Sequence, residues 1–238
     1  MKFIFKSTLK FSVLYLLLYL LDSFFKNSED LVMYRYLSKT LLSFSLLFFY
    51  LINTNQSDAR KKNLIIISLA CFLAGDVFFI AGNSGNTYHF LIAAALFIIA
   101  KVCYSVRFFN NKDFKISKLV PFLLFCFCYM SVIMSIVYNE LGFYFLPLLI
   151  YLFVVMMLMQ FAYLRSNEVN LQSFWLVIFG VVASMVADSI NILRMFYDAD
   201  IAYNKITIMF FYCLSQYLII LGVLNETKST SKLKPINV

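Results

Sequence analysis

Four charged side chains stand inside long apolar stretches of the sequence. Asp76, Lys101 and Asp188 lie well within such stretches, and Lys39 lies about one turn into another. On membrane-insertion scales, Asp or Lys at the centre of a span costs about 2.5–3.5 kcal/mol. Because that cost is avoidable, intramembrane charges mark functional sites more often than purely structural ones. The alternative is a buried Asp–Lys pair, such as Asp76 with Lys101, that only holds helices together.

The two aspartates are the residues best suited to chemistry, because paired carboxylates can divide the roles of proton donor and base. Asn191, which shares a helix face with Asp188, is a candidate wall residue, as are Tyr212 and Gln216. Their alternative role is interhelical hydrogen bonding. His89 is the only histidine, and no Cys/His cluster, glycine-rich phosphate loop or nucleophile elbow occurs. We therefore expect no metal and no cofactor, and chemistry carried by carboxylates with help from lysine, tyrosine and amides.

The composition predicts that these residues lie in a bundle of membrane-spanning helices. Of 238 residues, 63% are hydrophobic and 13% charged, whereas soluble domains average about 45–50% apolar and 25% charged residues. A span needs about 20 mostly apolar residues, and lipid cannot satisfy the edges of an open sheet. We predict an all-α polytopic bundle, one integral membrane domain over residues 1–238, with eight transmembrane helices at 9–25, 35–52, 64–81, 88–107, 119–138, 143–164, 172–195 and 205–224.

Basic residues predict the orientation of this bundle. Most of them fall in the loops and tails on the side that holds both termini, and the other side receives only Lys26, Arg35, Arg194 and Lys205. The positive-inside rule therefore places both termini in the cytoplasm. Short loops and the lack of a transit peptide favour a bacterial plasma membrane. The net charge of +8 is accordingly assigned to helix orientation and lipid headgroups, not to nucleic acid.

The eight spans also divide into two sets of four with the same orientation. Span three then corresponds to span seven, which matches Asp76 with Asp188, and span four corresponds to span eight. Asp76 precedes Lys101 by 25 residues, and Asp188 precedes Gln216 by 28. A parallel 4+4 repeat about an axis along the membrane normal would bring both aspartates to one depth, facing a shared cavity.

Several short motifs follow one another in the order and at the spacing of a known family. They are Gly75-Asp76, a span ending in Tyr104, Pro147 to Tyr151, Met156 to Met159 followed by Ala162, Ala187-Asp188-Ser189, the pair Tyr212 and Gln216 on one helix face, and Lys39 near the start of span two. Together they resemble the YhhN family of lysoplasmalogenase-like membrane proteins. The chain departs from the family pattern at Thr40 in place of proline, Lys101 in place of histidine or a related polar residue, and Ala187 in place of serine.

The resemblance implies hydrolysis of the vinyl ether bond of lysoplasmalogens to a fatty aldehyde and a glycerophospho-base. Asp76 and Asp188 would then be catalytic, in an order that remains open. Lys39 and Lys101 would keep one carboxyl ionised or bind the lipid phosphate, while Tyr104, Asn191, Tyr212 and Gln216 would line the substrate site. The expected partner is a membrane lipid or lysolipid, with the oligomeric state left open. The alternatives are a small transporter built on the parallel repeat and a non-catalytic lipid-binding membrane protein.

Overall fold

The computed structural model describes residues 2–27, 31–82, 86–109 and 116–227. These residues form helices and no β-strand, which confirms the predicted all-α class. The helices are α1 (Lys2–Lys6), α2 (Thr8–Asn27), α3 (Val32–Asn53), α4 (Ala59–Gly82), α5 (Thr87–Phe108), α6 (Ile116–Val137), α7 (Phe145–Leu164), α8 (Leu171–Phe196) and α9 (Asn204–Leu224). Short 3-10 turns, among them η4 (Gly142–Tyr144) and η5 (Arg165–Asn167), connect some of them.

Eight of these helices, α2 to α9, are long and apolar enough to cross a membrane. They match the eight predicted spans, with ends that differ by a few residues. The largest difference is at α4, which begins at Ala59, whereas the apolar stretch begins at Leu64. The Asp58 side chain accepts hydrogen bonds from the backbone N–H groups of Arg60 and Lys61, at 2.9 and 3.3 Å. This cap allows the helix to begin in its polar segment.

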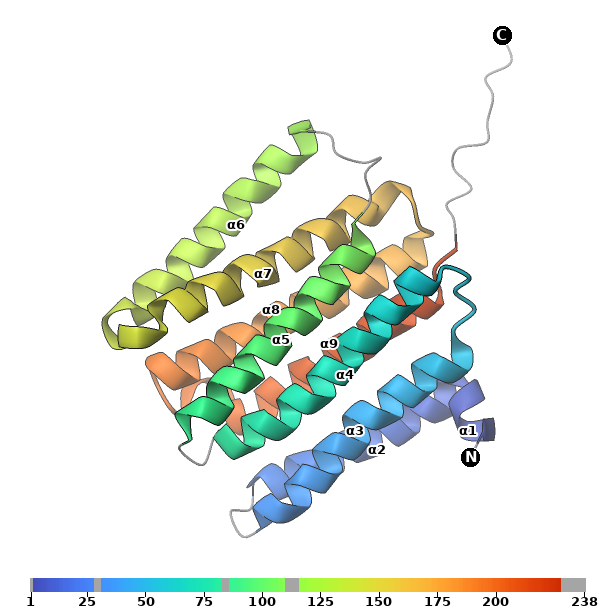
Figure 1. Cartoon of the computed structure of the whole chain (residues 1–238), viewed down its shortest axis with the longest axis horizontal. Helices are drawn as coiled ribbons and strands as arrows, with labels where there is room; N and C mark the ends of the chain where they lie inside the picture. The colour runs from blue at the N-terminus through green and yellow to red at the C-terminus, as the bar shows by residue number, and fades with distance from the viewer. Residues whose placement is uncertain (1, 28–30, 83–85, 110–115, 228–238) are drawn as a thin grey trace.

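Seven of the long helices form a closed ring. Contacts connect α2 to α3, α3 to α4, α4 to α5, α5 to α7, α7 to α8, α8 to α9, and α9 back to α2 (Figure 1). Helix α6 stands outside this ring, packed against α7 and α8. The start of α2 and the end of α9 lie at the same end of the bundle. We name that end the terminal end, and the end where α2 finishes and α3 begins the mouth end.

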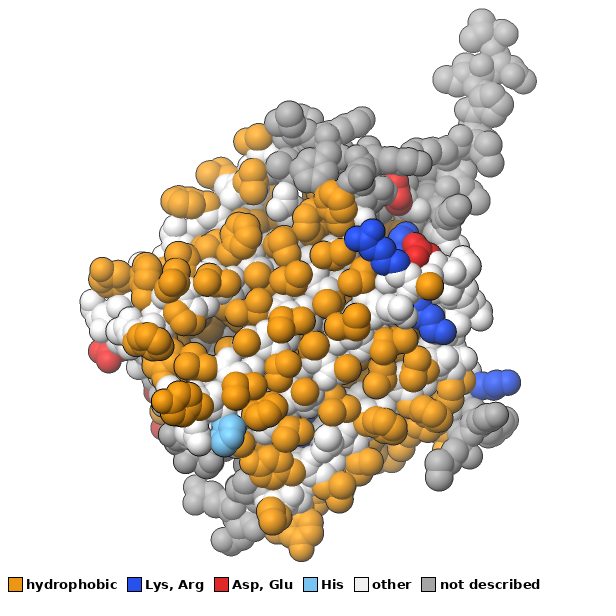
Figure 2. All heavy atoms as spheres, viewed as in Figure 1, with side chains coloured by type: hydrophobic (Ala, Val, Ile, Leu, Met, Phe, Trp, Pro, Cys, Tyr) orange, Lys and Arg blue, Asp and Glu red, His pale blue; other side chains and the backbone are white. Residues whose placement is uncertain are grey.

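The apolar side chains of the ring helices face outward as well as inward. Large hydrophobic residues that are strongly exposed include Leu17 on α2, Phe153 on α7 and Phe179 on α8. Figure 2 shows hydrophobic side chains over most of the visible face and charged groups near its edges. An apolar belt of this kind is what lipid solvates, so the fold is consistent with an integral membrane protein. Both the cytoplasmic location of the termini and the 4+4 repeat remain predictions, and Lys112, Lys115, Lys228, Lys232 and Lys234 lie outside the described residues.

Candidate functional site

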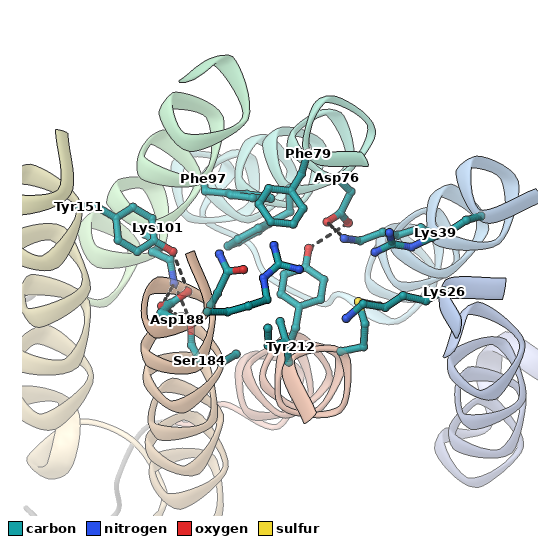
Figure 3. A pocket seen from close by; sticks show the side chains of 17 residues that line it. Lys26, Lys39, Asp76, Phe79, Phe97, Lys101, Tyr151, Ser184, Asp188 and Tyr212 are labelled. Atoms are coloured by element: carbon teal, nitrogen blue, oxygen red, sulfur yellow. Dashed lines mark hydrogen bonds and ion pairs between the residues drawn. The ribbon is translucent and has the colours of Figure 1, made fainter. Parts of the chain in front are cut away.

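A cavity of about 70 Å³ opens within the ring toward the mouth end. Every ring helix contributes to its wall, whereas α6 contributes none of the lining residues. The wall consists of Lys26, Arg35, Lys39, Phe72, Asp76, Phe79, Phe97, Lys101, Tyr151, Ser184, Ala187, Asp188, Asn191, Arg194, Ile208, Met209 and Tyr212. Figure 3 shows the two aspartates on opposite sides of this cavity, each beside a lysine and a tyrosine. All four residues singled out by their cost in lipid therefore border the same space.

Asp76 accepts two hydrogen bonds and forms one ion pair. Ser43 donates a hydrogen bond to its Oδ2 at 2.6 Å, and the Tyr212 hydroxyl donates to the same oxygen at 3.0 Å. The Lys39 ammonium lies 3.1 Å from the other oxygen, Oδ1. Only 1% of Asp76 is exposed. A carboxylate at this depth persists only when it is paired and hydrogen-bonded, and these partners from α3 and α9 meet that requirement.

Asp188 has partners of the same three kinds. The Lys101 ammonium donates to its Oδ2 at 2.8 Å, and the Tyr151 hydroxyl donates to Oδ1 at 2.6 Å. Ser184 accepts a hydrogen bond from Lys101 at 2.7 Å and lies 3.4 Å from Asp188 Oδ2 as a donor. The Asp188 side chain is 15% exposed, so it is the more accessible of the two carboxylates.

Both clusters thus contain aspartate, lysine, tyrosine and serine. We name them the Asp76 cluster (Asp76, Lys39, Ser43 and Tyr212) and the Asp188 cluster (Asp188, Lys101, Tyr151 and Ser184). For lysine and tyrosine, shifting the partner helices of Asp76 by four spans gives the partner helices of Asp188, with the two residue types exchanged: α3 corresponds to α7, and α9 to α5. The serines do not follow this shift, because Ser43 lies on α3 and Ser184 on α8, the helix of Asp188. This correspondence leaves the 4+4 repeat a prediction. It predicts that the two carboxylates can do related chemistry.

The structure brings six of the eight predicted site residues to the cavity wall: Lys39, Asp76, Lys101, Asp188, Asn191 and Tyr212. Tyr104 and Gln216 are not on this wall. The Tyr104 hydroxyl donates a 3.0 Å hydrogen bond to Gln216 Oε1, and Gln216 borders a separate cavity of about 10 Å³. Their bond connects α5 to α9, which is the interhelical role weighed for Gln216 from the sequence. The suggested pairing of Asp76 with Lys101 is wrong, because Lys101 pairs with Asp188 and Asp76 with Lys39.

Sequence reasoning did not select several wall residues as site residues. Arg35, Arg194 and Lys26 were counted only as outer basic charges, and Tyr151 only as part of a motif. A helical stripe could have found some of them, because Ser184, Asp188, Asn191 and Arg194 recur at spacings of four, three and three and so share one face of α8. Ser43 carries no comparable signal.

A second cavity of about 70 Å³ adjoins the first and is almost entirely apolar. The two share Phe79, Phe97, Tyr151 and Asn191 as wall residues. Beyond them, the second cavity is lined by Phe90, Leu91, Ala94, Tyr144, Pro147, Leu148, Ile192, Met195 and Phe196. The site thus combines a charged chamber with an apolar one, which suits a ligand with a polar end and a hydrocarbon end. Within the described ranges, no group of three or more metal-ligating side chains occurs.

Comparison with known proteins identifies the family. The model of the YhhN family matches residues 34–223, a range that contains both aspartate clusters. No curated protein and no solved structure matches the chain. Because the family match covers most of the chain, this protein belongs to the YhhN family.

Proposed function

We propose that this protein is a hydrolase that cleaves the vinyl ether bond of lysoplasmalogen-type lipids. Water would be consumed, and the products would be a fatty aldehyde and a glycerophospho-base. The observation that carries the proposal is the placement of two aspartates, Asp76 buried and Asp188 partly buried, each with a lysine and a tyrosine, on one cavity. Membership of the YhhN family is consistent with this activity.

Vinyl ether hydrolysis needs acid catalysis at carbon. A proton adds to the alkenyl carbon remote from oxygen, which leaves an oxocarbenium ion at the carbon attached to oxygen. Water adds to that carbon and loses a proton, and the resulting hemiacetal collapses to the aldehyde and the free glycerol hydroxyl. Glycoside hydrolysis passes through a similar cation and uses one protonated and one ionised carboxyl group. Asp76 and Asp188 would supply this pair.

In each cluster, a lysine ammonium lies beside the carboxylate and would supply it with a proton. A proton that shifts from Lys101 to Asp188, over the 2.8 Å hydrogen bond, makes a neutral carboxylic acid without uptake from outside. The same shift from Lys39 would serve Asp76, whose Oδ1 lies 3.1 Å away. Groups within hydrogen-bond reach of a reacting atom can act as general acid and base. The carboxylate that stays ionised would stabilise the cation across the cavity.

The apolar second cavity offers a place for the part of the hydrocarbon chain next to the ether. Because Phe79, Phe97, Tyr151 and Asn191 border both chambers, a chain in the apolar chamber would continue directly into the charged one. The alkenyl ether lies at the junction between the chain and the glycerol. This arrangement would place that bond next to the Asp188 cluster, to which Tyr151 belongs.

The test is an assay of aldehyde release from lysoplasmalogen by the purified full-length protein in detergent. Asp76→Asn and Asp188→Asn should each lower the rate by about 10²–10⁴-fold, the usual contribution of a general acid or base. Arg60→Gln, which removes an exposed cation at the terminal end, should leave the rate unchanged. In D₂O, the aldehyde should carry one deuterium on the carbon next to the carbonyl, because that carbon receives the proton.

Two results would overturn the proposal. One is full activity in both aspartate variants. The other is uptake of lipid or solute into liposomes that contain the protein, with no chemical conversion, which would favour a transporter.

A further inference from the structure

Three cations surround the mouth of the charged cavity, in addition to the two lysines paired with aspartate. They are Lys26 on α2, Arg35 on α3 and Arg194 on α8, and we name them the cationic rim. Lys26 lies one residue before the end of α2, Arg35 three residues after the start of α3, and Arg194 two residues before the end of α8. At about 1.5 Å per residue, all three therefore lie roughly 5 Å or less from a helix end.

The aspartates lie deeper than this rim. Asp76 and Asp188 are six and eight residues from the ends of their helices, which corresponds to roughly 9 and 12 Å. The cavity is thus layered along its depth, with cations at the mouth and carboxylates below them. Five cations and two carboxylates line it among the described residues. Lys39 and Lys101 are paired with the two aspartates, and the other three cations form the rim.

Arg35 is the rim residue with a buried nitrogen that lacks an acceptor. It is only 8% exposed, and its Nε has no hydrogen-bond partner. Within the described part of the chain, no carboxylate lies within 4.0 Å of its guanidinium nitrogens. The buried carboxylate of Asp22 accepts a hydrogen bond from Ser38 at 2.7 Å. A buried N–H without an acceptor is costly, and that cost is recovered when an anion binds.

We propose that the cationic rim binds the phosphate of a single-chain phospholipid. The inference rests on the proposed function, and it names the part of the substrate that the aspartates do not touch. Guanidinium groups match phosphate oxygens in bidentate geometry, and Arg35 and Arg194 supply two of them. Arg35 precedes Lys39 on α3 by four residues, and Arg194 follows Asp188 on α8 by six. These spacings correspond to roughly 6 and 9 Å along the helix axes. A glycerol unit, which separates phosphate from ether oxygen by three carbons, fits between these layers.

This assignment moves phosphate binding away from Lys39 and Lys101, whose ammonium groups are held by Asp76 and Asp188. It also predicts which chemical feature the protein selects. The phosphate diester should be required, whereas the alcohol esterified to it should matter little, because the cavity ends at the rim.

The experiment measures binding to the full-length protein in detergent with two lipids that have no vinyl ether. They are 1-O-octadecyl-glycerophosphocholine and 1-O-octadecylglycerol, which differ only in the headgroup. The phospholipid should bind at least tenfold more tightly. Arg35→Gln and Arg194→Gln should weaken it by about 10- to 100-fold, the loss expected for a hydrogen bond between charged groups. Neither variant should change binding of octadecylglycerol, Arg35→Lys should retain part of the preference, and Arg60→Gln should retain all of it.

Inorganic phosphate serves as a third probe, to separate a lipid headgroup from free phosphate. It should compete with the phospholipid only at much higher concentration, because it lacks the chain. If inorganic phosphate bound as tightly as the phospholipid, the rim would be a site for the free ion, and the proposal of a lipid headgroup would be overturned. If the wild-type protein bound the two lipids with equal affinity, the proposed phosphate site would be overturned, even if Arg35→Gln failed to fold. Neither lipid contains a vinyl ether, so the binding assay and the aldehyde assay are independent. Loss of the preference for the phospholipid with intact aldehyde release would refute the phosphate site alone. An intact preference without aldehyde release would refute only the hydrolase.

Discussion

At the scale of single residues, the two ion pairs of the cavity are a poor choice for stability alone. Burying two charges costs more free energy than burying a well-packed apolar pair of similar size. Replacing a buried ion pair by such an apolar pair is therefore often neutral or stabilising. The protein nevertheless places Asp76 with Lys39 and Asp188 with Lys101 in its interior. That choice is understandable when the charges take part in chemistry at the cavity.

A buried ion pair should respond differently to the loss of one partner and to the loss of both. Lys101→Met leaves Asp188 without its ammonium partner, so it should lower the free energy of unfolding by about 3–5 kcal/mol. Lys101→Met combined with Asp188→Leu should recover most of that loss, yet release no aldehyde. Thermal unfolding in detergent and the aldehyde assay measure the two effects on the same samples. A stable double variant with normal activity would show that the pair is structural only.

The residues that could be predicted are those whose presence in lipid is expensive. Asp76, Asp188, Lys39 and Lys101 each interrupt an apolar stretch, so their cost reveals them. Tyr151 and Ser184 carry no such penalty, because tyrosine and serine are common in buried helices. Their role depends on which helices are neighbours, and the same dependence explains why Lys101 pairs with Asp188 rather than with Asp76.

At the scale of the helices, length and polarity were enough to locate all eight spans, but not their order in space. Sequence adjacency would place α6 between α5 and α7, yet α5 contacts α7 directly and α6 lies outside. Apolar helices that are similar all round carry little information about which face meets which neighbour. Close approach is instead set by small residues. Gly180 on α8 and Gly82 on α4 fill that role, since a Cβ at either would lie within 3.0 Å of a backbone nitrogen of the partner helix.

Gly180 provides a direct test of this packing. An added Cβ would lie 2.8 Å from Ile219 Cγ1, 3.0 Å from its backbone nitrogen and 3.1 Å from the Ser215 carbonyl oxygen. Gly180→Val should force α8 and α9 apart and destabilise the protein by about 1–3 kcal/mol, as overpacking does. It should also lower aldehyde release, because α8 carries Asp188 and α9 carries Tyr212.

The control is Ala70→Val on α4, which adds the same kind of bulk at an exposed position. Its unfolding midpoint should stay close to that of the wild type. If Gly180→Val unfolds at the same temperature as Ala70→Val, the close α8–α9 contact is not needed for stability.

At the scale of the whole molecule, charge is concentrated at the two ends of an apolar bundle. The mouth end holds the cationic rim, and the terminal end holds a cluster that we name the clasp: Arg107, Arg165 and Glu226. Glu226 accepts hydrogen bonds from Arg107 at 2.8 Å and from Arg165 at 2.9 Å. The Arg165 guanidinium also lies 4.6 Å from the centre of the Phe108 ring. The clasp connects the end of α5, the turn after α7 and the segment after α9, so it closes the ring at the end remote from the cavity.

Glu226→Gln should therefore weaken the fold without changing the chemistry. Burial lowers the pKa of Arg165 to about 10, and Glu226 opposes this shift. Arg165 is thus still charged at neutral pH, and loss of the carboxylate leaves two buried guanidinium groups repelling each other. The expected cost is about 1.5–3 kcal/mol, that of hydrogen bonds to a charged group, and it should appear as an unfolding midpoint several degrees lower.

Aldehyde release measured below that midpoint should equal the wild-type rate, because the clasp and the cavity lie at opposite ends. Glu140→Gln, at an exposed carboxylate, is the matched control, and equal midpoints for the two variants would mean that the clasp does not hold the ring closed.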